Sequence, residues 1–313
     1  RFEQVIDCYI YGRGSTLVNS NYLLVNILHD SYNIDKVVST ETILLLKYSE
    51  KRGIPMKKMP AIFVGHGSPM IALDYNELTE TYRRLGERIL ATFGKPKAIL
   101  MVSAHWYTRG TLVQSAAKPR QVYDMYGFPK ELYALKYEPT GNADLTRDLT
   151  DLLGTDVEVD DSWGIDHGTW SILVHIFPKA DIPVVQLSVN GLIDARQSYE
   201  LGQKLASLRE KGCLIMGSGN VVHNLRLVEW ENEHGTPAAD RFDAAIKAAI
   251  EQRNDEAVID FQRYPDADYA VPTPDHFLPM LYILGASRGE SPYVFNNVRN
   301  LGSMALTGYA FGL

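Results

Sequence analysis

The chain has 313 residues, a net charge of −7, a hydrophobic fraction of 45% and a charged fraction of 22%. Such proportions are typical of a globular protein, and the acidic balance argues against nucleic-acid or anionic-membrane partners, because few cations are left to meet phosphates. The two cysteines, Cys8 and Cys213, are far apart, so a disulfide framework or a thiolate zinc site is not expected. No apolar run reaches the ~18 residues that span a bilayer. With no cleavable signal peptide recognised, we expect a cytoplasmic protein.

Residues 1–55 differ from the rest of the chain. They are rich in Leu, Ile, Val, Asn, Ser and Tyr without a clean period, and all eight methionines lie at or after Met56. Two interpretations are open: a small N-terminal subdomain, or a translated upstream region with the native start at Met56 or Met59. The purine-rich codons that residues 50–53 require would suit a ribosome-binding site, which favours the second. We therefore expect a non-domain extension over 1–55 and one domain over 56–313.

Apolar runs and amphipathic stretches alternate after Pro60. Strands are predicted at 61–64, 98–102, 112–113, 157–159, 183–189 and 213–216, with edge strands at 293–296 and 304–310. Helices are predicted at 76–91, 142–153, 194–211, 238–251 and 276–284. Continuous apolar strands separated by helices indicate a single α/β domain, whose mostly parallel sheet is covered by helices on both faces.

Histidines follow three of the predicted strands directly or after a few small residues. They are His66, His105 and His223. Ligands of open α/β sheets bind beyond the carboxyl ends of the strands, so these three side chains can converge at one edge. Imidazole is the commonest metal ligand, and a histidine-rich site without cysteines suits Zn, Fe, Cu or Ni. The spacing predicts a metal site but does not choose the ion.

The other histidines are judged one by one. His276 opens an apolar helix after a proline-rich loop, and His167 lies in a loop with no evident packing role. Both are further candidates. A lone histidine is more often a hydrogen-bonded core or loop residue than a ligand, so His29, His175 and His234 are left unassigned. The chain contains no GxSxG nucleophile elbow, no GxxxxGK[ST] loop and no strand-linked GxGxxG.

Six short motifs appear in an order that resembles a known family. They are Gly65-His66-Gly67-Ser68-Pro69, Ser103-Ala104-His105-Trp106, Tyr126-Gly127-Phe128-Pro129, Asp166-His167-Gly168-Thr169-Trp170, Ser218-Gly219-Asn220-Val221-Val222-His223-Asn224 and Thr273-Pro274-Asp275-His276. Together they resemble the DODA-type 4,5-DOPA extradiol dioxygenases, which belong to the class III extradiol ring-cleaving superfamily related to protocatechuate 4,5-dioxygenase. The resemblance covers Met59 to Leu313.

The resemblance implies one non-haem metal ion per chain, Zn²⁺ or Fe²⁺, at the carboxyl ends of the strands. By motif, the ligands would be His66, His105, His223 and His276. In the wider superfamily the third ligand is a glutamate, and this chain has His276 near the expected place of that glutamate. The superfamily histidine that matches His223 acts as an acid/base and not as a ligand. His167 matches a histidine that contacts the substrate hydroxyl. We therefore expect His167 and His223 as catalytic residues, with the role of His223 open.

The implied reaction is insertion of dioxygen into a catechol, such as the 4,5-cleavage of L-DOPA, with catechol and dioxygen as the only expected partners. A non-catalytic zinc-binding protein on the same scaffold is the alternative, because zinc has no redox chemistry. A zinc hydrolase using Asp166 or Asp275 as base ranks third. The oligomeric state is not predicted.

Two local expectations concern the surroundings of the site. Aromatic side chains could line a substrate slot, although aromatics are more often core residues; the candidates are Trp106, Tyr126, Phe128 and Trp170. Gly217-Ser218-Gly219 is predicted to be a flexible turn, which would let His223 swing between metal and substrate.

Overall fold

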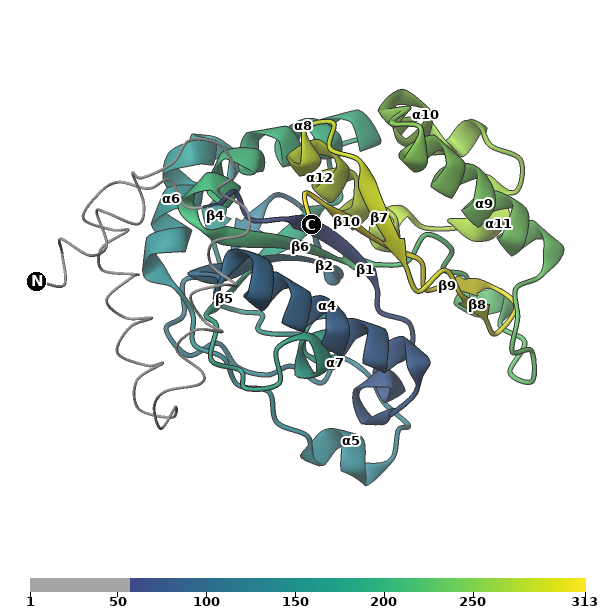
Figure 1. Ribbon diagram of the computed structural model, residues 1–313, viewed down its shortest axis with the longest axis horizontal. Coiled ribbons are helices and arrows are strands. Elements are labelled where there is room, and N and C mark those ends of the chain that lie inside the picture. The colour runs from purple at the N-terminus through teal and green to yellow at the C-terminus, as the bar shows by residue number, and fades with distance from the viewer. Residues whose placement is uncertain (1–56) are drawn as a thin grey trace, which may run out of the picture. The chain divides into compact units, whose positions relative to one another are not determined.

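The structure, a computed structural model, describes residues 57–313, so the predictions for residues 1–55 and for His29 lie outside it. Its centre is an eight-stranded sheet in the order β4-β3-β5-β2-β6-β1-β10-β7 (Figure 1). The strands are β1 (Ala61–Gly65), β2 (Ala98–Thr108), β3 (Leu112–Val113), β4 (Glu158–Val159), β5 (Val184–Asn190), β6 (Cys213–Gly219), β7 (Pro292–Phe295) and β10 (Gly308–Phe311). A small ribbon pairs β8 (Arg299–Asn300) with β9 (Met304–Ala305).

The middle of the sheet is parallel. β5, β2, β6 and β1 run in the same direction, whereas β10 and β7 add an antiparallel pair beyond β1. On the other side, β3 pairs antiparallel with β5. The predicted α/β fold with a mostly parallel sheet is confirmed.

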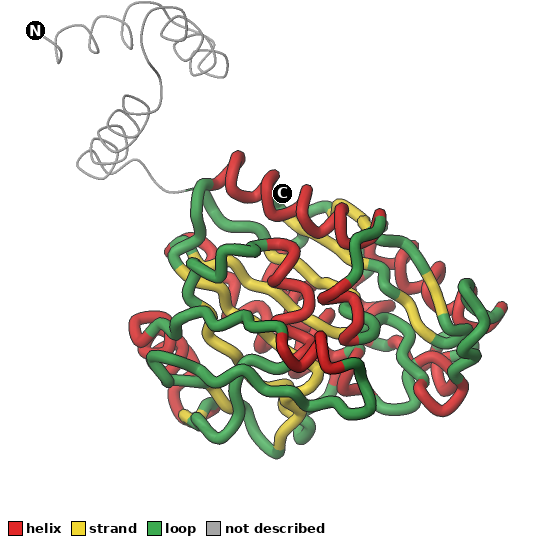
Figure 2. Tube along the Cα trace, turned by 90° about the horizontal axis from the view of Figure 1, so that it is seen from below, coloured by secondary structure: helices red, strands yellow, loops and turns green. Residues whose placement is uncertain are grey.

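Helices cover both faces, because buried side chains of each central strand alternate between two cores. Ile62 and Val64 face the core formed with α4 (Glu77–Phe93) and α7 (His167–Ile176). Ala61 and Phe63 face the opposite core. Helices of that second layer are α6 (Ala143–Leu153), α8 (Ala195–Leu205), α9 (Pro237–Glu251) and α12 (Leu278–Ser287). Figure 2 shows the strands running behind a layer of helices.

Close helix packing in each layer depends on glycine. A Cβ on Gly86 of α4 would lie 1.9 Å from the carbonyl oxygen of Ile176, at the end of α7. In the other layer, a Cβ on Gly202 of α8 would lie 2.1 Å from the carbonyl oxygen of Tyr282 in α12. Both distances are far below a van der Waals contact, so any larger residue would push the helices apart.

Two predictions for individual segments are wrong. The run 304–310 was expected at the sheet edge, but β10 lies inside the sheet between β1 and β7; β7 is the edge strand, as predicted for 293–296. The supposed turn Gly217-Ser218-Gly219 is the end of strand β6, paired with β1 and β2. Its glycines are needed for close packing: a Cβ on Gly219 would lie 2.2 Å from the carbonyl oxygen of His276.

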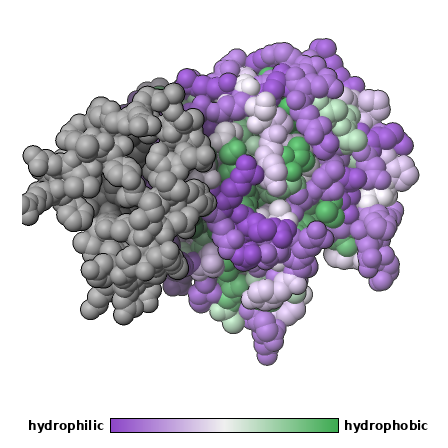
Figure 3. Space-filling model, viewed as in Figure 1, coloured by the Kyte–Doolittle hydropathy of each residue, from purple (hydrophilic) through white to green (hydrophobic). Residues whose placement is uncertain are grey.

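Short helices fill the connections between these elements. They are α5 (Lys130–Ala134), α10 (Asp255–Ile259), α11 (Ala267–Ala270) and several 3₁₀ turns, including Pro69–Leu73 and Pro274–His276. Among the described residues, no helix combines the length and the apolar character that crossing a membrane requires. Most of the described surface on the face in Figure 3 is hydrophilic, with apolar residues in small scattered groups.

Candidate metal centre

His66 follows strand β1 and is held by the neighbouring strand β6. Its backbone N–H donates to Gly219 (3.1 Å), and its Nδ1 lies 2.9 Å from Oγ of Ser218. Ser218 Oγ donates its own proton to the carbonyl of Gly168, so it can only accept from the imidazole. Nδ1 of His66 therefore carries the proton, and the Nε2 lone pair is left to face the interior.

His105 reaches the same point from β2, after a register shift between Ser103 and Tyr107. Its Nε2 lies 3.0 Å from Nε2 of His66, and its Nδ1 lies 3.1 Å from Oδ2 of Asp124. The ring packs over Gly168, where a Cβ would come within 2.8 Å of it. A carboxylate can only accept, so Asp124 directs a second Nε2 lone pair at the centre.

His276 enters from the opposite core, at the end of the 3₁₀ turn before α12. The close approach to Gly219 fixes its backbone, and Asn220 N–H donates to its carbonyl oxygen (2.9 Å). Its Nδ1 contacts the carboxylate of Asp275, whereas its Nε2 is buried without any hydrogen-bond partner. The ring centroid lies 5.3 Å from that of His66 and 5.0 Å from that of His105.

His167 is the first residue of helix α7 and not, as predicted, part of a loop. Asp166 caps this helix by accepting from Thr169 N–H (3.1 Å). It also accepts from Ser103 Oγ (2.8 Å) and Trp163 Nε1 (3.1 Å). With its carboxylate fully buried among donors, Asp166 is unsuited to the base role that a zinc hydrolase would give it. His167 lies 3.9 Å from His105, centroid to centroid.

His223 stacks on His276. The ring centroids are 3.5 Å apart and the ring planes differ by 5°. Atoms of His223, Asp275 and His276 lie within 4.8 Å of one another, as in a metal site. A nitrogen lone pair lies in the plane of its ring, however, and two nearly parallel planes 3.5 Å apart do not meet near the rings, so both rings as placed cannot bind one ion along their lone pairs. Because His276 has its Nδ1 held by Asp275 and its Nε2 free, this geometry favours His276 as the ligand.

Asp124 is a site residue that the sequence analysis missed. Its Oδ2 lies 3.1 Å from Nδ1 of His105 and 3.0 Å from Nδ1 of His167, and its Oδ1 accepts from the backbone N–H of His167 (2.9 Å). The contact with the His167 ring is close but lacks hydrogen-bond geometry, so it is a polar contact between a carboxylate and an imidazole. Burial alone would raise the pKa of Asp124, yet the two histidines outweigh it and hold that pKa well below its usual range.

Most rings of the cluster are neutral near pH 7. Burial lowers the pKa of His66 well below its usual range, and the neighbouring histidines lower it further. Burial likewise lowers the pKa of His223 to about 2 and that of His276 to about 4. Burial and then His105 lower the pKa of His167. Neutral imidazole is the form that binds a cation or accepts a proton.

His105 differs from the others. Burial lowers its pKa, but the carboxylates of Asp124, Asp166 and Asp275 outweigh burial, so the pKa is raised. The carboxylates around His105 therefore favour a positive charge at this ring. Either a proton or a cation satisfies that attraction.

The donor set fits a metal ion. The Nε2 atoms of His66 and His105 face each other, and nitrogens of these two rings and of His167 lie within 4.8 Å of one another, as do side-chain atoms of His223, Asp275 and His276. His66, His105 and His276 each have Nδ1 at an acceptor, as in known metal-binding histidines, which favours these three as the ligands. Two nitrogens bound at about 2.0–2.1 Å to one tetrahedral ion lie roughly 3.3 Å apart; those of His66 and His105 are 3.0 Å apart. The buried, unpartnered Nε2 of His276 is the kind of atom that a bound cation satisfies.

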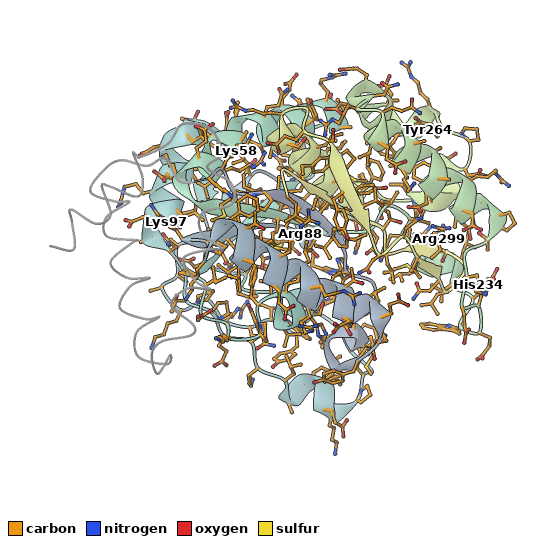
Figure 4. The ribbon with its side chains drawn as sticks, viewed as in Figure 1. Lys58, Arg88, Lys97, His234, Tyr264 and Arg299 are labelled. Atoms are coloured by element: carbon orange, nitrogen blue, oxygen red, sulfur yellow. The ribbon has the colours of Figure 1, made fainter. Side chains whose placement is uncertain are left out.

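The aromatic candidates are divided between the core and the surface, and the partly buried Phe128 packs against the core of α4 and α7. Trp106 and Trp170 are buried core residues, and Trp170 donates to the carbonyl of Val122 (2.9 Å), whereas Tyr126 is 93% exposed. The cluster does not include the two described histidines that were left unassigned. His175 donates to the carbonyl of Ile71 (2.7 Å), and His234 lies at the margin of the domain (Figure 4).

Comparison with known proteins identifies the scaffold that carries this site. Residues 60–312 match the family described as the catalytic LigB subunit of aromatic ring-opening dioxygenase. The chain belongs to this family. It is an oxidoreductase of the aromatic ring-opening dioxygenase class, and the resemblance to the DODA-type extradiol enzymes is confirmed.

Several relatives of the LigB family are similar over most of their length. The 4,5-DOPA dioxygenase extradiol of Escherichia coli K12 is 41% identical over 241 residues, which cover 75% of this chain and 88% of that protein. The 4,5-DOPA dioxygenase extradiol of Beta vulgaris is 35% identical over 256 residues, covering 80% of this chain and 95% of that one. A crystal structure of an uncharacterized Escherichia coli K12 protein, 36% identical, superposes with a TM-score of 0.70 and covers 81% of this chain and 100% of that one.

Proposed function

We propose that this chain cleaves the ring of a catechol by extradiol insertion of dioxygen at one non-haem metal ion, with L-DOPA opened at its 4,5 bond as the substrate. The observation that carries the proposal is the histidine cluster itself, in which His66, His105 and His276 each hold Nδ1 at an acceptor and so leave Nε2 for a cation. Relatives named 4,5-DOPA dioxygenase extradiol support the choice of substrate.

We propose Fe²⁺ as the ion of the active protein, because ring cleavage by dioxygen requires a redox-active metal and zinc has no redox chemistry. Bound by His66, His105 and His276, the ion would supply open positions for both catechol oxygens and for dioxygen, and a path for electrons between them. Three protein ligands leave that room, whereas four histidines on a tetrahedral ion would fill it.

The proton transfers are assigned to two histidines. A base must take a proton from a catechol hydroxyl and later return one, work that suits a neutral imidazole. His167 is fixed by helix α7 and Asp124, so we assign it to binding and orienting the hydroxyl. The ring of His223 contacts one other ring of the cluster, that of His276, on which it stacks. We assign His223 to taking the hydroxyl proton and returning it.

The test is to add Fe²⁺ or Zn²⁺ to the metal-free protein with L-DOPA and dioxygen. We expect oxygen uptake and the yellow ring-opened product with Fe²⁺ only, one dioxygen per L-DOPA. A reaction mixture without dioxygen and a catechol methylated on one hydroxyl are the controls. Tight binding of either ion with no oxygen uptake would overturn the proposal.

That negative result would favour the second candidate, a zinc-binding protein without catalysis. The observation on its side is the crowding of five imidazoles at one point, where His223 and His276 already touch face to face. A cytoplasmic location remains part of the proposal.

A further inference from the structure

We propose that Asp124 is a positioning residue that ties the metal ligand His105 to the substrate-facing His167. One carboxylate oxygen lies within 3.1 Å of Nδ1 of His105 and 3.0 Å of Nδ1 of His167. The other oxygen accepts the backbone N–H of His167 at 2.9 Å. The Asp124 side chain thus contacts the ring of His105 on the metal side, and both the ring and the backbone of His167 on the substrate side. The inference rests on the proposed function.

The first consequence concerns the imidazole tautomers. A carboxylate offers no proton, so His105 must present Nδ1–H to it. A lone pair at Nδ1 of His167, 3.0 Å from the same oxygen, would be repelled, which favours Nδ1–H on that ring as well. Nε2 of His105 is then a lone pair aimed at Nε2 of His66, and Nε2 of His167 is a lone pair available to a hydroxyl. Without the carboxylate each ring could flip or exchange tautomers, and the two lone pairs would no longer be fixed together.

The second consequence concerns how rigidly the two rings move. Asp124 lies in the irregular segment between β3 and α5, with its side chain 10% exposed. Among the described residues, its ion-pair contacts are with these two histidines. A displacement of this segment would therefore shift a metal ligand and the substrate-facing His167 at once.

Two other carboxylates in the site lack this arrangement. Asp275 contacts one ring, that of His276. Asp166 accepts from Ser103, Thr169 and Trp163, and it forms no ion pair with a histidine ring of the described residues. Asp275 is therefore a matched control: it supports a metal ligand as Asp124 does, but it does not touch His167.

The experiment compares Asp124→Asn with Asp275→Asn, each alone and combined with His167→Gln. Asn is isosteric with Asp, and far-UV circular dichroism checks the fold; Asp124→Glu is the second variant, should Asn not fold. Zinc affinity is measured by competition with a chelator. Binding of 4-nitrocatechol to the zinc-loaded protein is measured by absorbance, so no readout depends on turnover.

Both Asn variants should lose about 10–100-fold in zinc affinity, the usual effect of removing a partner of a metal ligand. Asp124→Asn should also weaken 4-nitrocatechol binding by about tenfold. In the His167→Gln background, the same substitution should weaken that binding by less than about twofold. Asp275→Asn and His167→Gln should combine additively. Additive effects of Asp124→Asn and His167→Gln, or unchanged zinc affinity in Asp124→Asn, would overturn the inference.

The wild-type protein separates the two possible failures. If it binds zinc and 4-nitrocatechol while the Asp124 variants behave as wild type, the inference alone is wrong. If it binds neither, the proposed function is wrong, and the inference falls with it.

Discussion

His223 and His276 lie face to face, with their ring centroids 3.5 Å apart and their planes inclined by only 5°. Asp275 contacts Nδ1 of His276. The ring of His223 makes no hydrogen bond with the described residues, and only its backbone N–H is bound, to the carbonyl of Ala270 (2.8 Å). We therefore expect a substitution of His223 to act on proton transfer and not on metal binding.

His223→Gln should retain Fe²⁺ and lose turnover by about 10²–10⁴-fold, the usual contribution of an acid/base group. Metal per chain and kcat are measured on the same preparation, with L-DOPA as substrate. Full turnover in this variant would leave His167 as the only base among our candidates. A parallel loss of metal and kcat would instead make His223 a ligand.

Replacing His66, His105 or His276 by Ala should each remove most of the bound metal without unfolding the domain. Each substitution deletes one of the three proposed nitrogen ligands, while the strands and helices that carry them remain packed. Metal analysis after dialysis, with circular dichroism for the fold, gives the result. His175→Ala is the matched control, since His175 bonds to the backbone outside the cluster and should leave the metal content unchanged. Full occupancy in all three ligand variants would contradict the assignment.

A chain that starts at Met56 should show the kcat and the unfolding midpoint of the full chain. All proposed catalytic residues lie later, and the family match begins at residue 60. Met59 must stay, because its N–H donates to the Arg209 carbonyl (3.0 Å) and its own carbonyl accepts from the buried Arg209 guanidinium (2.6 Å). A chain that starts at Ala61 should therefore unfold at lower denaturant. A lower kcat in the Met56 variant would give residues 1–55 a part in the active domain.

Asp243 should make the protein less stable as the pH rises. Burial raises its pKa to about 6, against the opposing pull of Arg299 and Thr307, and Arg299 reaches it from the margin of the domain (Figure 4). A group whose pKa is higher in the folded state contributes stability below its unfolded value and loses it as pH rises through the folded value. The window here runs from about 4 to about 6.

The measurement compares wild type with Asp243→Asn, whose side chain does not ionise. From pH 4 to pH 7, the unfolding free energy of the wild type should fall by about 2 kcal/mol relative to that of Asp243→Asn. Urea titrations at both pH values give this double difference, in which groups common to both proteins cancel. The same difference at both pH values would show that Asp243 is not buried as a high-pKa acid.

The sequence predicted the positions of His66 and His105 because a buried parallel strand is a continuous apolar run, and its end is visible where small and polar residues begin. Helix α7 was not predicted from the sequence. Eight of its ten residues are buried, so it has no polar face and no helical period, and the Asp166 cap is its main signal. Strand β6 was cut short because Gly217 and Gly219 suggest a turn, whereas they are required by close neighbours.

Asp124 could not have been found from spacing. It belongs to no strand or helix, and its distance along the chain from His105 and His167 follows no period. Only the folded path of its segment brings it between their rings. A loop carboxylate next to an aromatic motif carries no pattern that separates it from a solvated one.

The pairing of β1 sets the order in which a newly made chain can acquire its site. Ala61 pairs with Ile215 on one side and with Phe311 on the other, so the strand that ends at His66 waits for partners translated long after it. Domains fold as units during synthesis, and here the unit cannot close until β10 (Gly308–Phe311) has been made. We therefore expect metal loading to follow synthesis of β10, and arrested chains that stop before Gly308 should remain sensitive to protease even with metal present.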